Sequence, residues 1–194
     1  MINNILASWN LDFKSDEYIF DYLIKKCKQK CFYIDKFPLS IPDYYRYKYD
    51  QVNVFYQEIV DKNKDKEQFA NIENRYKYVI HKLWMYNDIY IEYDPSCLIS
   101  AKARDYIDLE YNEYLTLLEN KMDCQEHKII NIKELDFWIQ VGIRNVAFPI
   151  MYFNKWEFIL SPCWSCYIGY LNNSLYYKKI DDIVVSEGLF VRSS

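Results

Sequence analysis

The chain has 194 residues and a formal net charge of −4, and it contains 21 tyrosines but only 3 glycines. Glycine lets a backbone wrap around a phosphate or turn sharply beneath a nucleophile, and 3 isolated glycines leave no phosphate-binding loop. The mild acidity argues against a dedicated duplex-DNA binder, which needs a basic stripe. It is compatible with binding a basic protein. The length predicts one domain over residues 1–194.

Two features of the chain predict a cytoplasmic protein. Residues 1–13 carry neither the positively charged segment nor the continuous apolar segment of a signal peptide. The longest apolar run, Val146–Phe153, is too short to cross a membrane. In the cytoplasm we expect the 6 cysteines to be reduced thiols rather than disulfides.

The first part of the chain predicts helices around one short strand. Ser15 can cap a helix over Asp16–Cys31, which opens with acidic residues and closes with lysines, and Phe32–Asp35 is strand-like. A second helix follows Asp50, and a longer one runs over about 65–86 with apolar residues at helical spacing. The short link between these two predicts an antiparallel helical hairpin.

The middle of the chain alternates between strand and helix patterns. Asp88–Tyr93 alternates as a strand, and Ser100 can cap a long helix that reaches about Met122. Lys128–Ile130 is again strand-like.

A short helix over Ile132–Val141 has signals at both of its ends. Asn131 and Glu134 form a pair that resembles a capping box. Gly142 is expected to end the helix as its C′ residue.

From Val146 onward the pattern becomes that of strands. Three consecutive strands are predicted over 146–153, 156–160 and 164–171, with Asn172-Asn173 as a hairpin turn. A brief helix over Lys179–Ser186 ends at Gly188, and a last strand follows over 189–192. These patterns predict an α+β fold, in which the helical N-terminal two-thirds pack on a C-terminal antiparallel sheet.

The sharpest local motif is the C-x-x-C formed by Cys163 and Cys166. A redox pair needs its first cysteine at the start of a helix, but the residues that follow resemble a strand and a turn. A zinc site needs two more ligands, which Cys27 and Cys31 could supply. Since these two also fit the apolar stripe of their own helix, we favour buried thiols, with no metal and no cofactor.

The sequence shows no recognisable catalytic constellation. His81 and His127 are the only histidines, and neither is flanked by a serine or cysteine in a nucleophile setting. Carboxylates are abundant, and an enzyme that uses an unfamiliar carboxylate site is our third hypothesis. No catalytic residue is nominated.

One segment interleaves aromatic and cationic residues, and it supports an alternative function. If it is extended, its tyrosines share one face and its cations the other, which suits single-stranded nucleic acid. The residues are Tyr45, Arg46, Tyr47, Lys48 and Tyr49, within Tyr44–Tyr49. The net negative charge favours the simpler interpretation, in which the tyrosines pack on the domain and the charges face water.

The helix predicted over 100–122 carries an acidic face edged by tyrosines. An acidic face of this kind is expected wherever a helix faces water, and it then needs no function. It also suits contact with a basic partner protein, because tyrosine offers a large contact area at a small entropy cost. The residues are Asp105, Asp108, Glu110 and Glu113, with Tyr106, Tyr111 and Tyr114.

In overall type the chain is similar to the small, acidic, cytosolic α+β proteins that low-GC bacteria and their phages encode beside toxins or defence systems. The similarity covers no definable motif. It implies a non-enzymatic cytosolic binding protein that neutralises or regulates a basic partner protein, as an immunity protein or antitoxin acts on a toxin. We expect no membrane association, and we regard nucleic acid as the alternative partner.

Overall fold

The computed structural model describes residues 2–13, 18–38, 56, 66–93, 103–119, 125–163 and 166–193. These residues form one seven-stranded sheet in the order β3-β2-β4-β5-β6-β1-β7, and every neighbouring pair is antiparallel. The strands are β1 (Cys31–Asp35), β2 (Ile89–Tyr93), β3 (Gln125–Lys128), β4 (Ile150–Phe153), β5 (Phe158–Cys163), β6 (Cys166–Leu171) and β7 (Phe190–Ser193).

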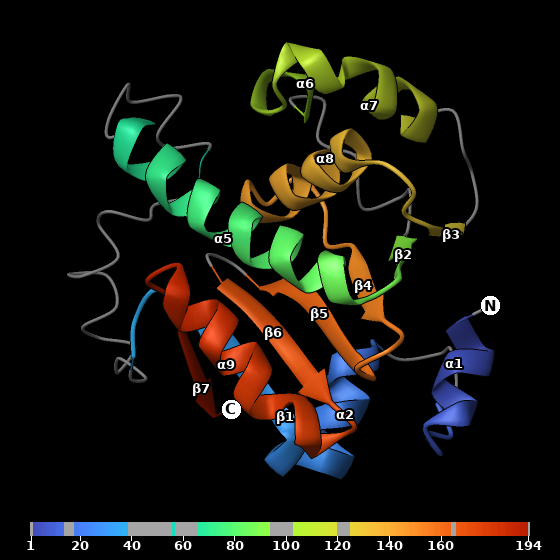
Figure 1. The fold of residues 1–194 in the computed structure, drawn as a ribbon. Helices are drawn as coiled ribbons and strands as arrows, with labels where there is room; N and C mark the ends of the chain where they lie inside the picture. Colours follow the sequence, from blue (N-terminus) through green and yellow to red (C-terminus); the bar gives the residue numbers. More distant parts are fainter. Residues whose placement is uncertain are drawn as a thin grey trace.

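Helices cover both faces of this sheet (Figure 1). One face carries α5 (Lys66–Tyr86), α8 (Ile132–Ile143) and α9 (Tyr177–Ser186). The other face carries α1 (Ile2–Ser8) and α2 (Ile19–Cys27). A further layer packs on α8, away from the sheet, and consists of α6 (Ala103–Tyr106), η4 (Leu109–Tyr111) and α7 (Asn112–Glu119). Two short 3₁₀ turns, η1 (Lys28–Lys30) and η5 (Ser174–Tyr176), precede β1 and α9.

The strand order shows that the expected fold was wrong. The sheet was expected to come from the C-terminal third, but the strands β1, β2 and β3 of the mainly helical N-terminal two-thirds belong to it as well, and β1 lies between β6 and β7. The sheet is therefore interleaved in sequence rather than built from the C-terminal third. Burial gives the physical reason, because β1 is almost wholly buried and such a strand needs a neighbour on each edge and a helix layer on each face.

Strand alternation divides the apolar residues between two cores. Along β5, Phe158 and Leu160 join the core under α5, α8 and α9. Ile159, between them, joins the smaller core under α1 and α2, together with Tyr170 of β6. Successive strand residues point to opposite faces, so one short strand serves both cores.

Two predicted helices are shorter or more broken than expected. The helix expected over Asp16–Cys31 is described only as α2, and Cys31 already belongs to β1. The helix expected over 100–122 is interrupted at Asp108, whose backbone is extended with φ −64° and ψ 141°. At this break, the backbone N–H of Asp108 donates to Gln140 Oε1 at 2.9 Å rather than to its own helix.

The signals around α8 gave one correct and one incorrect prediction. Asn131 caps the helix as expected, since its Oδ1 accepts from the backbone N–H of Glu134 at 2.8 Å. Gly142 does not end the helix, which continues to Ile143. A Cβ on Gly142 would lie 2.3 Å from Pro162 Cγ, so this glycine allows α8 to approach β5 closely.

Several other local predictions are confirmed. The helix over about 65–86 and the strand near 88–93 correspond to α5 and β2. Gly188 ends the last helix with a positive φ of 72°. The predicted Asn172-Asn173 hairpin turn was wrong, because Asn173 Oδ1 instead accepts from the N–H of Leu175 and caps η5.

Some predictions fall on parts of the chain outside the described residues. These include the Ser15 and Ser100 caps. They also include the helix predicted after Asp50, of which only Tyr56 is described, and therefore the predicted helical hairpin. Across the described ranges, no helix is both long enough and apolar enough to span a membrane.

Candidate functional site

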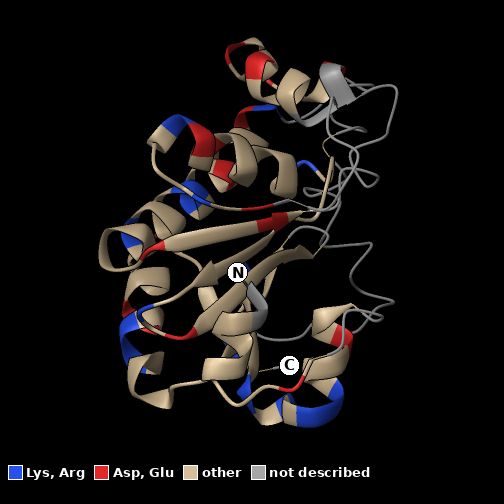
Figure 2. Cartoon of the chain, turned by 90° about the vertical axis from the view of Figure 1, so that its right-hand side faces the viewer, with Lys and Arg blue, Asp and Glu red and all other residues tan. Residues whose placement is uncertain are grey.

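The acidic residues predicted for partner binding lie on the α6–α7 layer. Asp105, Glu110 and Glu113 are exposed. Figure 2 shows red acidic segments at the top of the molecule, in this layer. Two leucines lie among them, Leu109 with 85% and Leu117 with 55% of its surface exposed. The exposed side of this layer is therefore mixed apolar and acidic.

The tyrosines of the same layer are less available than the sequence suggested. Tyr106 and Tyr111 are buried. Tyr114 is half-buried, its ring stacks on Phe137, and its hydroxyl donates to Asn131 Oδ1 at 3.3 Å. This contact brings the segment around Asn131 to α7, and the neighbours of Asn131 in the sequence, Ile130 and Ile132, are 78% and 50% exposed.

Asp108 belongs to a buried ion network around Arg144, which is only 5% exposed. The Arg144 guanidinium donates to both carboxylate oxygens of Glu73, at 2.8 and 2.9 Å, and to Asp108 Oδ1 at 2.9 Å. It also donates to the carbonyl of Tyr106 at 2.8 Å, and its Cζ lies 4.2 Å from the centre of the Tyr56 ring. The network ties the α6–α7 layer to α5 and α8.

The charges in this network shift the pKa values of both partners. Burial alone lowers the pKa of Arg144, but the hydrogen bonds and charges of Glu73 and Asp108 outweigh it and the pKa is raised. Burial raises the pKa of the Asp108 carboxyl, but Arg144 and Gln140 outweigh it and the pKa is lowered. Both groups are therefore held in their charged forms.

The two histidines each pair with a carboxylate on α8. His81 Nε2 lies 2.5 Å from Asp136 Oδ1, and Lys77 Nζ lies 2.7 Å from the other oxygen of the same carboxylate. His127 Nε2 lies 2.6 Å from Glu134 Oε1. These contacts connect α5 and β3 to α8, and they assign both histidines a structural role.

The cysteine pairs lie too far apart to share a zinc ion. Cys163 and Cys166 face each other where β5 meets β6, and a strand, not a helix, follows them. Cys31 lies opposite Tyr170, four strand residues from Cys166, which is roughly 13 Å. Zinc–sulfur bonds are only about 2.3 Å long. Among the described residues, no group of His, Cys, Asp or Glu is arranged to hold a metal ion.

Burial also makes two of the described cysteines poor nucleophiles. Burial, with a smaller effect of Cys27, raises the pKa of the Cys31 thiol to about 11. A hydrogen bond with Cys163, followed by burial, raises the pKa of Cys166 well above its ordinary value. Cys97 and Cys124 lie outside the described residues, as do Tyr45, Arg46, Tyr47, Lys48 and Tyr49 of the alternative nucleic-acid segment.

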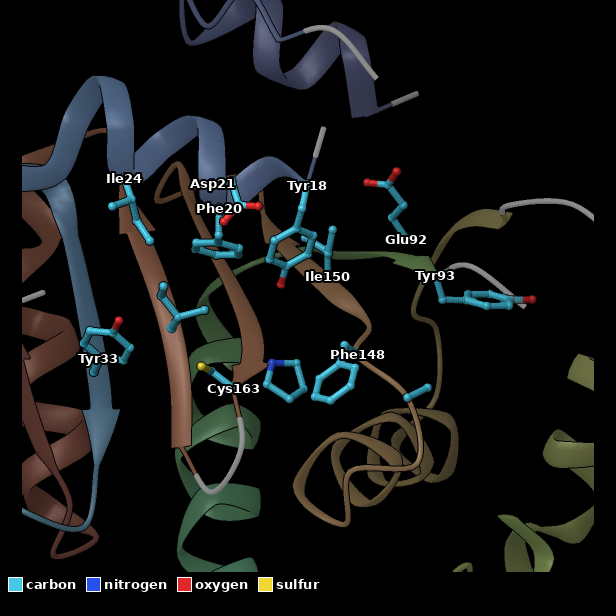
Figure 3. Close-up of a pocket in the computed structure, with 13 residues that line it drawn as sticks. Tyr18, Phe20, Asp21, Ile24, Tyr33, Glu92, Tyr93, Phe148, Ile150 and Cys163 are labelled. Carbon is cyan, nitrogen blue, oxygen red and sulfur yellow. The ribbon is translucent and has the colours of Figure 1, made fainter. Parts of the chain in front are cut away.

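A cavity of about 600 Å³ opens on the face of the sheet that α1 and α2 cover (Figure 3). We call it the α2 pocket, and its lining comes from α2, five strands and the residues before β4. It is lined by Tyr18, Phe20, Asp21, Ile24, Tyr33, Glu92, Tyr93, Ala147, Phe148, Ile150, Pro162, Cys163 and Ile168. Sequence analysis missed this site because its residues converge only in the folded sheet.

Polar groups in and beside the α2 pocket are held by hydrogen bonds. The Tyr18 hydroxyl donates to Ser161 Oγ at 2.9 Å, and burial raises the pKa of Tyr18 to about 12. The Tyr152 hydroxyl donates to Glu92 Oε2 at 2.6 Å. Burial, followed by the negative charge of Glu92, raises the pKa of Tyr152, which therefore remains a neutral donor to that carboxylate.

The fold defines the molecule as an α/β protein with a central antiparallel sheet, helices on both faces and a further helical layer on α8. In comparisons with protein-family models, curated proteins and solved structures, nothing matched this chain. Functional inference therefore depends on the two sites described above.

Proposed function

We propose that this chain is a non-enzymatic, cytosolic binding protein that neutralises or regulates a basic partner protein, in the manner of an immunity protein or antitoxin. The observation that carries the proposal is a row of exposed leucines among exposed carboxylates on η4 and α7. We call this the α7 surface, and it consists of Asp105, Leu109, Glu110, Glu113, Tyr114, Leu117, Ile130 and Ile132.

The spacing of three of these residues supports a common face. Glu113 and Leu117 are four residues apart on α7 and are therefore neighbours on its surface, and Leu109 lies in η4 directly before this helix. Leu109 and Leu117 are too exposed to stabilise the fold, but they offer apolar area to a partner. The carboxylates around them complement a basic protein and would accelerate its encounter.

Charge reversal at the α7 surface tests the proposal. The chain is immobilised, proteins from the source cells are captured, and association with the purified basic partner is measured at low and moderate salt. Glu110→Lys with Glu113→Lys should slow association about tenfold at low salt, and the difference should shrink as salt screens the charges.

A matched control changes two adjacent acidic residues on a different helix. Asp181→Lys with Asp182→Lys alters net charge equally on α9 and should leave the association rate close to that of the wild type. If both double variants slow association equally, or if no basic protein is captured, the proposal fails. Binding of a single-stranded oligonucleotide that is lost in Tyr45→Ala with Tyr47→Ala would instead support the alternative function.

A further inference from the structure

We propose that the α2 pocket binds a hydrophobic organic cation, meaning an amine whose body is aromatic or aliphatic. This inference is independent of partner binding at the α7 surface. The pocket lies on the α1–α2 face of the sheet, whereas the α7 surface belongs to the layer above α8 on the opposite face. The cavity of about 600 Å³ lies within the usual range of small-molecule sites.

The lining of the pocket favours an apolar body. Aliphatic side chains come from Ile24, Ile150 and Ile168, and Pro162 adds a further apolar surface. In Figure 3, Tyr18 and Phe20 lie on one side of the space, and Phe148 lies on the other. Phe148 is 45% exposed and Tyr18 is 43% exposed, so a ligand entering the pocket would cover aromatic surface that now contacts water.

The aromatic rings of the pocket also favour positive charge. An aromatic face carries negative potential and attracts an ammonium or guanidinium group within about 6 Å. Tyr33, which lines the pocket, already binds a cation in this way, since the Arg192 guanidinium carbon lies 4.3 Å from the centre of its ring. Arg192 also pairs with Asp35 at 2.9 Å, and neither of these two residues belongs to the pocket lining.

The charged residues of the lining point to the same ligand class. Among the residues that the structure describes, the lining contains the carboxylates of Asp21 and Glu92 and no lysine, arginine or histidine. Glu126 lies directly opposite Glu92 in the β2–β3 pair, and such cross-strand neighbours share one face of the sheet. An anionic ligand would meet this negative charge, whereas an ammonium group would be attracted to it.

Three probes with one body and different head groups test the inference. Biphenylmethylamine, biphenylmethanol and biphenylcarboxylate are positively charged, neutral and negatively charged at neutral pH, and their binding to the full chain is measured by calorimetry. The amine should bind at least about tenfold more tightly than the alcohol, because both the rings and the carboxylates favour its charge. The carboxylate probe should show no binding at millimolar concentration.

Two variants locate the binding in the pocket. Asp21→Asn removes one charge at an exposed position and should reduce the preference for amine over alcohol about threefold. Phe148→Ala removes an exposed ring and should weaken both probes, the amine more than the alcohol, because an aromatic ring attracts positive charge. Asp182→Asn, on α9, is the matched control and should change neither probe, and circular dichroism confirms that each variant is folded.

Several results would contradict binding of an organic cation in the α2 pocket. Equal binding of amine and alcohol, tighter binding of the carboxylate probe, or no binding of the amine at millimolar concentration overturns the inference. So does amine binding that is unchanged in both Asp21→Asn and Phe148→Ala. Capture of a basic partner at the α7 surface is a separate measurement, so either proposal can fail while the other holds.

Discussion

In the part of the chain that the structure describes, the two faces of the sheet differ in how closely the helices pack on them. One face is covered by α5, which has 21 residues, and by α8 and α9. Here α8 packs so closely on β5 that there is no room for a methyl group on Gly142 beside Pro162. On the other face, α1 and α2 have only 7 and 9 residues, and they leave a cavity of about 600 Å³. Both faces carry a buried core, and the described residues fill the first face more completely than the second.

The largest expected difference is between two phenylalanines, one on each face. Phe158 is fully buried and its ring stacks on Phe153 at 4.1 Å, whereas Phe148 is 45% exposed beside the α2 pocket. Phe158→Ala should lower the free energy of unfolding by about 4 kcal/mol. Phe148→Ala should lower it by only about 0.5 kcal/mol. Urea denaturation of both variants measures the difference, and similar losses would contradict the comparison.

A somewhat smaller effect is expected at the ion network above the filled face. Arg144→Met keeps an unbranched apolar stem but removes the guanidinium and leaves the largely buried Glu73 carboxylate without its partner, so the free energy of unfolding should fall by about 3 kcal/mol. Adding Glu73→Gln should recover part of this loss, because it removes the unpaired charge. Urea denaturation measures the free energy of unfolding of the single and double variants. If the double variant is no more stable than the single one, the loss comes from packing rather than from the unpaired charge.

The close approach of α8 to β5 predicts a loss of intermediate size. In Gly142→Ala the new methyl group would collide with the Pro162 ring, and the free energy of unfolding should fall by about 2 kcal/mol. The double variant Gly142→Ala with Pro162→Ala should be more stable than the single variant, since Pro162→Ala removes the Cγ atom with which the new methyl group collides. Thermal unfolding followed by circular dichroism compares them, and a neutral single variant would show that the interface can relax.

The smallest expected effect concerns pH. The pKa of Asp108 is lowered in the folded state, so its contribution to stability is present above its unfolded pKa and is lost as pH falls through the lowered value. Since half of its side chain is exposed, we expect a contribution of only about 1 kcal/mol. Asp108→Asn should flatten the dependence of stability on pH below about pH 4, measured by urea denaturation at several pH values. An unchanged pH dependence would exclude this contribution.

Local structure was predicted well wherever the signal lay within a few residues. The apolar spacing of α5, the Asn131 cap of α8 and the positive φ of Gly188 each depend on short-range geometry. The break at Asp108 was missed because its partners, Gln140 and Arg144, lie more than 30 residues further along the chain. A helical pattern alone does not reveal that a distant side chain competes for its backbone.

In the candidate sites, too, some features could be predicted from local sequence and others depended on distant contacts. The exposed carboxylates of the α7 surface could be named from the sequence, because charged residues usually face water. The orientation of Tyr106 and Tyr111 toward the interior could not, since a tyrosine suits both a core and a surface. The α2 pocket had no signal in the sequence, because its lining comes from segments between Tyr18 and Ile168.

The sequence by itself determined several local elements of this protein, among them α5, the Asn131 cap of α8 and the end of α9 at Gly188, because caps and helical periodicity depend on neighbouring residues. Only the tertiary structure decided the order of the strands, with β1 between β6 and β7. A short apolar strand can pair with many edges, and the choice depends on which arrangement buries both of its faces and satisfies its backbone. The pocket follows from the same arrangement, because its lining combines α2 with five strands that are far apart in the sequence.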